Sequence, residues 1–207
     1  ETPRWGVGDA STDYVRVVTV TDGGPLTDTQ STTISVTNVN EAPVITGGAT
    51  DTASVAENTN AATTVIDVAH SDVDSGDTIA YTLTGSVDDG LFDIVSGTGV
   101  VTFKSSPAFE TPLGGTGDDS NTYEINVNVN DGTVDVVQAH AIAVVNVNDN
   151  SPVFSTSAFT GIAENQTAVG TAAATDGDGE SLTFTLAGTG ADDGLFSITN
   201  GGVITFS

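Results

Sequence analysis

The sequence predicts an all-β fold, organised as a tandem array of β-sandwiches with one complete and two partial copies. Apolar and polar residues alternate along many short segments, turn sequences recur between these segments, and blocks of sequence return at a constant spacing. No long stretch has the periodicity of an amphipathic helix. Many short alternating segments with closely spaced turns are typical of a β-sandwich.

The alternation is clearest at residues 123–129, where Tyr, Ile and Val interleave with Glu and Asn. Residues 79–83 and 182–186 have the same pattern. A period of two places one set of side chains on the core face of a sheet and the other set in water. The sequence therefore predicts a strand at each of these places. Asp-Gly turn signals recur between such segments, for example at Asp131 and Gly132.

The repeat appears as matching blocks of sequence. VAEN at 55–58 returns as IAEN at 162–165, and DDGLFDI at 88–94 returns as DDGLFSI at 192–198. In the other direction, ETP at the start of the chain and the tyrosine at position 14 both return 109 residues later. The predicted organisation is then the last two strands of a repeat at 1–40, a complete repeat at 41–149, and the first five strands of a repeat at 150–207.

The charge of the chain excludes several classes of partner, and its lack of cysteine excludes two kinds of covalent or metal site. The chain has 28 acidic and 3 basic residues, and its formal net charge is −25. Such a surface repels nucleic-acid phosphates and anionic lipid headgroups, so we expect neither nucleic-acid binding nor membrane insertion. Its acidic residues either form a solvated surface, as is common where external salt is high, or form cation sites. The absence of Cys excludes disulfides and thiolate metal sites.

No apolar run approaches membrane-spanning length, and no charged-then-apolar segment marks a signal peptide at Glu1. Since we expect an extracellular protein, and such a protein must be exported, we interpret the chain as a mature product or an excised piece of something longer. We expect its place to be the extracellular space or the cell surface.

The complete repeat carries a set of short motifs in a fixed order. They are AEN at 56–58, DxD at 72–74, FE at 109–110, DG at 131–132 and NDNxP at 148–152. This ordered set resembles the cadherin domain, and the resemblance covers the whole chain when the two partial repeats are counted. It implies an Ig-like Greek-key sandwich, a role in cell adhesion, and Ca²⁺ bound at the junction between successive repeats.

The resemblance also implies which residues hold the ions, through oxygen atoms of the kind that Ca²⁺ prefers. At the second junction they are Glu57, Glu110 and Asp149 facing Asp176 and Asp178, with Asn146, Asn148 and Asn150 as further oxygen donors. At the first junction they are Glu1, Asn38, Asn40 and Glu41 facing Asp72, Asp74 and Asp131. Carboxylates that converge in this way cannot all stay ionised without compensating charge, which a dication supplies.

The chain departs from the cadherin pattern at several positions. Ala108 stands where cadherins usually carry an Asp, and Asn38 and Asn146 replace the first Asp of the linker motif, which suggests fewer or weaker ions. Trp5 does not match the N-terminal Trp that vertebrate adhesion cadherins use for strand exchange. The scarcity of Lys, with abundant Thr, Gly and Asn, favours a bacterial surface protein. Asp72 also has a simpler interpretation as a turn residue.

Three functions from different classes remain after this reading. The first is a Ca²⁺-stiffened spacer or polymer in an adhesin, biofilm or surface filament; the second is a binding module for carbohydrate or a cell-surface ligand; the third is an accessory domain of an enzyme. No nucleophile elbow, HExxH motif, Walker loop or paired Cys is present, so we do not expect an enzyme.

The partial repeats predict head-to-tail assembly. Residues 150–207 of one chain are completed by residues 1–40 of the next, and such a heterologous contact produces a filament. The neighbour's Glu164 then stands at the first junction, and the neighbour's Asp22 joins Asp176 and Asp178. The competing interpretation is that the chain is a window cut from a longer tandem array, in which covalently linked repeats make the same contacts.

Overall fold

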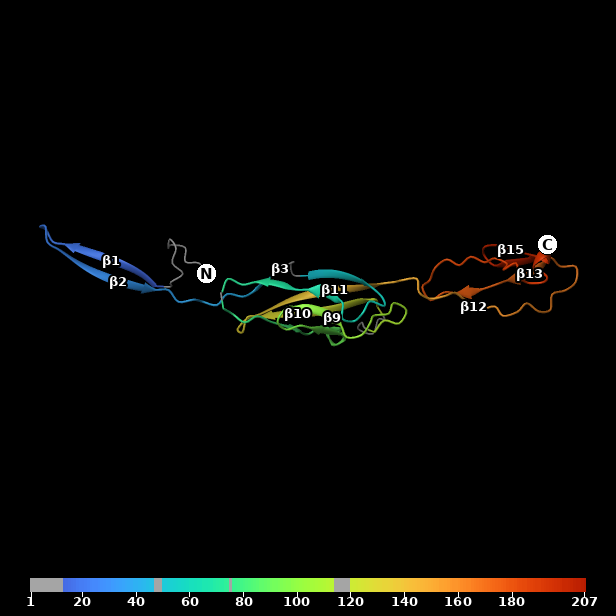
Figure 1. Ribbon diagram of the computed structural model, residues 1–207, viewed down its shortest axis with the longest axis horizontal. Coiled ribbons are helices and arrows are strands. Elements are labelled where there is room, and N and C mark those ends of the chain that lie inside the picture. Colours follow the sequence, from blue (N-terminus) through green and yellow to red (C-terminus); the bar gives the residue numbers. More distant parts are fainter. Residues whose placement is uncertain (1–12, 47–49, 75, 114–119) are drawn as a thin grey trace.

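The computed structural model of the protein describes residues 13–46, 50–74, 76–113 and 120–207, and its strands form three groups along one line (Figure 1). The strands β1 and β2 form one end, strands β3 to β11 the centre, and strands β12 to β16 the other end. We call these groups the N-terminal hairpin, the middle sandwich and the C-terminal unit. No helix of the described residues is long and apolar enough to cross a bilayer.

The N-terminal hairpin pairs β1 (Asp13–Thr21) with β2 (Thr27–Ser35) in antiparallel register, with Tyr14 opposite Ile34. Tyr14 is half-buried and every other residue of the two strands is exposed. An isolated two-stranded hairpin is marginally stable in water, because it has no apolar face to pack against. This hairpin therefore lacks a core of its own.

The middle sandwich stacks two main sheets. One has the strand order β4-β11-β10-β7, the other has the order β5-β9-β8, and β3 pairs separately with β6. Strand β4 runs parallel to β11 and the remaining pairs are antiparallel. The strands are β3 (Val44–Thr46), β4 (Thr50–Ala56), β5 (Thr64–Asp67), β6 (Ala69–Ser71), β7 (Ala80–Leu83), β8 (Phe92–Ile94), β9 (Val100–Phe103), β10 (Thr122–Asn130) and β11 (Asp135–Val145).

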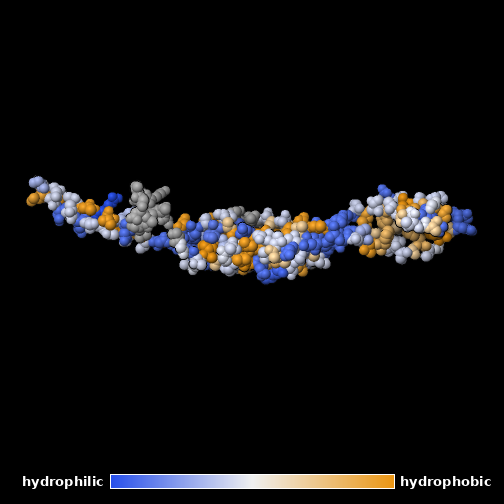
Figure 2. Space-filling view, viewed as in Figure 1, coloured by the Kyte–Doolittle hydropathy of each residue, from blue (hydrophilic) through white to orange (hydrophobic). Residues whose placement is uncertain are grey.

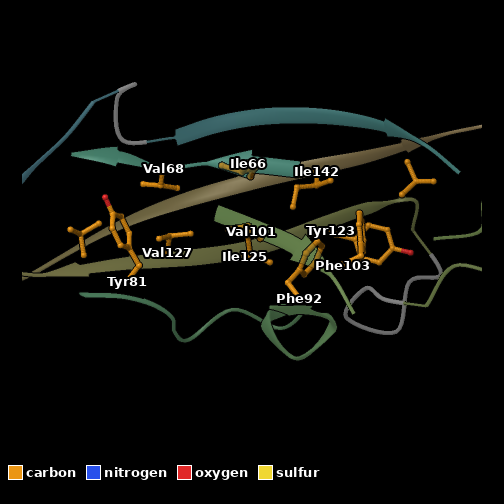
Figure 3. Packing of buried hydrophobic residues seen from close by; sticks show 12 residues of the cluster. Ile66, Val68, Tyr81, Phe92, Val101, Phe103, Tyr123, Ile125, Val127 and Ile142 are labelled. Carbon is orange, nitrogen blue, oxygen red and sulfur yellow. The ribbon is translucent and has the colours of Figure 1, made fainter. Parts of the chain in front are cut away.

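The core of the middle sandwich lies between these sheets (Figure 3). In β10, buried residues alternate with more accessible ones, and Tyr123, Ile125, Val127 and Val129 have no exposed surface. The strand predicted from the alternation at 123–129 is confirmed. Each fully buried side chain of this size stabilises the fold by about 1.5–3 kcal/mol relative to an exposed one.

The C-terminal unit reproduces half of this arrangement. The order β13-β16-β15 corresponds to β5-β9-β8, and the pair β12-β14 corresponds to β3-β6. A 3₁₀ turn precedes the first strand of each matching β-hairpin, η1 (Asp89–Leu91) before β8 and η2 (Asp193–Leu195) before β15. The strands are β12 (Val153–Phe154), β13 (Ala168–Thr171), β14 (Ala174–Thr175), β15 (Phe196–Ile198) and β16 (Val203–Phe206).

Matching glycines show that the middle sandwich and the C-terminal unit share backbone geometry in detail. Gly99 and Gly202 precede β9 and β16, with φ of +77° and +85°. A Cβ at Gly99 would lie 2.5 Å from the carbonyl oxygen of Val68, and one at Gly202 would lie 2.5 Å from that of Ala172. Only glycine fits such a left-handed conformation beside a neighbouring backbone.

Residues 182–186 differ from the expectation. Their alternation predicts a strand, yet residues 157–163 and 182–186 form no strand in the C-terminal unit. In the middle sandwich the matching strands β4 and β7 pair only with β11 and β10. The described residues of the C-terminal unit contain no counterpart of β10 and β11, so neither segment has a strand to pair with there, although Phe184 N donates a hydrogen bond to the carbonyl oxygen of Asn200 at 3.1 Å.

Candidate metal centres at the two junctions

Four carboxylates meet where the middle sandwich joins the C-terminal unit. Each of Glu57, Glu110, Asp149 and Asp178 offers an oxygen, and these oxygens all lie within 4.8 Å of one another. Glu57 follows β4, Glu110 lies in the loop after β9, and Asp149 follows β11, whereas Asp178 belongs to the loop after β14. The cluster therefore joins two separate units of the chain.

Glu57 is fixed by backbone donors. Its Oε2 accepts a hydrogen bond from Phe109 N at 2.9 Å, and its Oε1 accepts one from Val147 N at 2.8 Å. These donors lower the pKa of Glu57. The backbone N–H of Glu110 donates to its own carboxylate and lowers the pKa of that group. Desolvation and the neighbouring Asp178 and Glu57 together raise the pKa by more, so the pKa of Glu110 lies above its ordinary value. A cation placed among these four carboxylates would offset the repulsion between Glu110 and its acidic neighbours.

Linker residues hold Asp178 from the other side. Asp178 Oδ2 accepts hydrogen bonds from Asp149 N at 3.0 Å and Asn150 N at 2.7 Å. The side-chain amide of Asn150 donates to Asp178 Oδ1, and the amide of Asn146 donates to the carbonyl oxygen of Asp178. The Asn150 amide is the largest cause of a lowered pKa at Asp178.

A second acidic cluster at this junction contains Asp176, Asp178 and Glu180, again with oxygens within 4.8 Å of one another. Asp176 also accepts a hydrogen bond from Asp178 N at 2.9 Å. Asp178 is common to both clusters. Glu180 was not among the residues selected from the sequence, although it follows Gly179 directly behind the Asp176–Asp178 motif.

The first junction brings Asp72, Asp77 and Asp131 together, with their oxygens within 4.8 Å of one another. Asp77 was also missed from the sequence, and it too directly follows a glycine behind a DxD motif. Desolvation and the charges of Asp74, Asp72 and Asp131 raise the pKa of Asp77, even though its side chain is exposed.

Asp74 and Asp131 bind the linker residues ahead of the middle sandwich. Asp74 accepts hydrogen bonds from Glu41 N and from Asn38 Nδ2, each at 2.7 Å, which lower its pKa. Asp131 accepts from Val134 N at 2.6 Å and from Asn40 Nδ2 at 2.9 Å, and these donors strongly lower its pKa.

The remaining candidates lie outside these clusters. Glu1 falls outside the described residues. Asn148 is exposed and lies in the linker between Asn146 and Asp149, both of which contact Asp178. Asp22 lies in the turn between β1 and β2, where its Oδ1 accepts a hydrogen bond from Gly24 N at 2.7 Å. Glu164 is exposed in the turn after residues 157–163. Within one chain, neither Asp22 nor Glu164 joins an acidic cluster of the described residues.

The donor atoms fit a hard cation. Oxygen is the only ligand type that the three clusters offer, and Ca²⁺ takes about six to eight oxygen ligands. Two buried oxygens at the junctions, Asp72 Oδ2 and Asn146 Oδ1, accept no hydrogen bond from the described residues. A buried polar atom without a partner is energetically costly, and a cation bound at each of these places would be coordinated by the oxygen there.

The fold and its acidic junctions define the class of the protein as a tandem of cadherin-like repeats, and the predicted fold class is confirmed. A solved structure of protocadherin gammaB7 repeats EC3-6 superposes with a TM-score of 0.76 at 22% identity, covering 95% of this chain and 52% of that one. Human CDH23 repeats EC21-23 give a TM-score of 0.73 at 21% identity, covering 94% of this chain and 64% of that one.

Among curated proteins, human Protocadherin-1 is 33% identical over 203 residues. That match covers 91% of this chain and 18% of Protocadherin-1. The chain thus spans a small part of the length of that relative. No protein-family profile matches the chain.

Proposed function

We propose that the protein is a Ca²⁺-stiffened, extracellular repeat protein with a structural or adhesive role and no catalytic activity. The observation that carries the proposal is the second junction, where Glu57, Glu110 and Asp149 of one unit lie within 4.8 Å of Asp178 of the next. Bound Ca²⁺ supplies positive charge that holds these carboxylates together, and this charge fixes the angle between the units.

The proposed ligands comprise the carboxylates of the clusters and the neighbouring linker residues. At the second junction they are Glu57, Glu110, Asn146, Asn148, Asp149, Asn150, Asp176, Asp178 and Glu180. At the first junction they are Glu1, Asn38, Asn40, Glu41, Asp72, Asp74, Asp77 and Asp131. The proposed repeat boundaries stay at residues 1–40, 41–149 and 150–207.

The setting we propose is the outside of a cell, in a surface adhesin or filament of bacterial type. The net charge of −25 suits a protein that works among abundant cations, and the similarity to protocadherin repeats supports an extracellular place. Two of the three tyrosines, Tyr81 and Tyr123, are buried in the core, so the chain offers little aromatic surface for stacking on sugar rings. We therefore prefer a structural role to carbohydrate binding.

The protein also assembles head-to-tail in this proposal, with residues 150–207 of one chain completed by residues 1–40 of its neighbour. The support is the exposed apolar surface at both ends, including Val18 and Val20 in the hairpin and Phe154 and Leu195 in the C-terminal unit. Soluble monomers rarely leave large contiguous apolar surfaces in water. In the filament the neighbour's Glu164 reaches the first junction, and the neighbour's Asp22 reaches Asp176.

Calcium titration tests the stiffening. We expect millimolar Ca²⁺ to raise the unfolding temperature, because a ligand that binds only the folded state stabilises it. We also expect small-angle scattering on dilute protein to narrow the distribution of dimensions relative to EDTA. Magnesium at the same ionic strength is the control for screening. Identical melting and scattering curves in EDTA and in Ca²⁺ would refute the proposal.

A further inference from the structure

We propose that Asn200 is a site of spontaneous covalent modification, at which the backbone nitrogen of Gly201 displaces the side-chain amide and leaves aspartate or isoaspartate. Asn200 and Gly201 lie in the turn that joins β15 to β16 in the C-terminal unit. Neither calcium nor assembly enters this reaction, so the modification is independent of the function proposed above.

The order of residues in the sequence favours this site over every other asparagine. The chain contains a single Asn-Gly pair, and each other Asn is followed by a residue that carries a Cβ. A Cβ on the following residue obstructs the approach of its backbone nitrogen to the Asn side chain. Glycine has no Cβ, and it also reaches the widest range of backbone angles. The attack is therefore least hindered at Asn200.

The turn itself leaves the attacking N–H out of its hydrogen bonds. Gly202 N donates to the carbonyl oxygen of Thr199 at 2.9 Å, and Thr199 N donates to that of Val203 at 2.9 Å. Gly202 follows with a φ of +85°, and a β-turn succeeded by such a residue is a common connection between antiparallel strands. These bonds close the loop without using the N–H of Gly201.

Both reacting groups are accessible. Thr199, Asn200 and Gly201 are exposed. Among the residues that the structure describes, neither the Gly201 N–H nor the Asn200 side-chain amide takes part in a hydrogen bond. A Cβ built on Gly201 would meet only Thr199 Oγ1, at 3.9 Å. The surroundings therefore leave room for the Asn200 side chain to rotate onto the Gly201 nitrogen.

The middle sandwich shows that this exposure belongs to the turn. Its matching turn joins β8 to β9, and there Tyr81 N donates to the carbonyl oxygen of Ser96 at 2.9 Å, as Phe184 N does to that of Asn200 at 3.1 Å. Ser96 and Gly97 are exposed although strands surround the core of this sandwich on both faces. Hydrophilic residues lie at the surface of both units in Figure 2. Exposure of Asn200 therefore does not require that further strands be absent.

The reaction consumes only water. The Gly201 nitrogen bonds to Cγ of Asn200, the bond from Cγ to Nδ2 breaks, and the side-chain nitrogen leaves as ammonia with the proton of the Gly201 N–H. Because the two groups belong to adjacent residues, the attack is intramolecular and gains from proximity. Water then opens the cyclic imide. Opening at Cγ gives aspartate, and opening at the backbone carbonyl carbon gives isoaspartate; nothing is oxidised or reduced.

Both products alter the turn. Each adds one negative charge to a chain whose net charge is already −25. In isoaspartate the chain runs through Cβ and Cγ and is one atom longer, and the carbonyl that accepts from Phe184 N becomes a free carboxylate. Gly202 cannot shift to absorb the extra atom, because it is buried and a Cβ there would already lie 2.5 Å from the carbonyl oxygen of Ala172. We therefore expect isoaspartate to weaken the contact with Phe184.

Peptide mass mapping after incubation in warm, mildly alkaline buffer measures the reaction. We expect conversion at Asn200 and none at Asn165, which is also exposed but precedes Gln166. Gly201→Ala has room for its Cβ, so this variant should fold, and we expect it to lose the conversion at Asn200. Equal conversion of Asn165 and Asn200, or undiminished conversion in Gly201→Ala, would overturn the proposal.

The same incubation in urea separates the contribution of the fold from that of the sequence. We expect Asn200 to react in the folded and in the unfolded chain. Reaction in urea alone would show that the folded turn keeps the two groups apart, and no reaction in either state would show that the pair is inert; both results would overturn the proposal. Isoelectric focusing should reveal one added negative charge in the wild type and none in Asn200→Gln, and a methyltransferase specific for isoaspartate should label only the wild type.

Discussion

Asn150 holds Asp178 with two donors at once. Its backbone N–H donates to Asp178 Oδ2 at 2.7 Å, and its side-chain amide donates to Asp178 Oδ1 at 2.8 Å. Asp149, the last residue of the middle repeat, donates its backbone N–H to the same carboxylate at 3.0 Å, so these contacts already orient one unit on the other through the protein alone. The cation proposed at the same junction completes an alignment that the backbone has begun.

Removing Asp149 should weaken calcium binding at the second junction. We expect Asp149→Ala to lower the affinity by about tenfold or more, since it removes one carboxylate of a four-carboxylate cluster. Asp93→Ala is the matched control, because Asp93 is an exposed acid whose contact with Lys104 at 3.9 Å contributes little. Isothermal calorimetry of both variants gives the answer. Equal losses in the two variants would show that net charge, and not this site, governs binding.

Asp77 and Glu180 should prove to be ligands despite their absence from the motifs that we recognised. We expect Asp77→Asn and Glu180→Gln each to weaken binding at its own junction by several-fold, because each removes one charge from a three-carboxylate cluster. Asp67→Asn, which alters an exposed acid of β5, serves as the control. Calorimetric titrations that match the wild type for both variants would remove these residues from the sites.

Acid should destabilise the calcium-free protein partly through Asp131. Hydrogen bonds from Val134 and Asn40 lower the pKa of Asp131 from its ordinary value of 3.8, so the folded state favours the ionised form. The resulting stability is present above pH 3.8 and is lost as the pH falls below that value. We therefore expect Asp131→Asn to lower the unfolding temperature at pH 7. We also expect the unfolding temperature of this variant to fall less than that of the wild type when the pH is lowered from about 4 to about 2.

Thermal unfolding followed by circular dichroism in metal-free buffer measures this effect. Asp28→Asn, in the exposed strand β2, is the control. Parallel pH profiles for the wild type and Asp131→Asn would contradict the prediction.

Gly99→Ala should destabilise the middle sandwich by about 1–3 kcal/mol or more, because it combines a positive φ with a close backbone contact. The added Cβ would lie 2.5 Å from the carbonyl oxygen of Val68 and 2.8 Å from the ring of Tyr81. Gly97→Ala is the control, since a Cβ there meets nothing within 4 Å. Urea denaturation separates the two variants, and equal midpoints would argue against the steric account.

Structural features that depend only on residues adjacent in the sequence, such as the buried face of a strand, could be predicted from the sequence. The buried face of β10 follows from alternation alone, because a strand with one face in the core repeats every second residue. The same rule predicts a strand at residues 182–186, where none forms. Alternation describes which face a strand would bury, but a strand also needs a partner for its backbone, and local sequence does not reveal whether one is present.

The candidate metal ligands also divide into those that short motifs predict and those that only the three-dimensional fold reveals. Glu57, Asp149 and Asp178 stand out through short motifs, and the fold brings these motifs together. Asp77 approaches Asp131 only because the loop after β6 lies beside the turn after β10. That proximity depends on the three-dimensional path of two loops far apart in the sequence, so a scan for motifs overlooked Asp77.

Asp178 contributes to two acidic clusters at once, and this has a consequence for how the chain responds to its surroundings. In the proposed calcium-bound protein, an ion in one cluster would fix the Asp178 carboxylate for the other cluster and would also withdraw negative charge from it, so the two sites would be coupled. A change at Asp178 would then alter calcium binding in both clusters, whereas a change at Glu57 or Glu180 would act first on one of them.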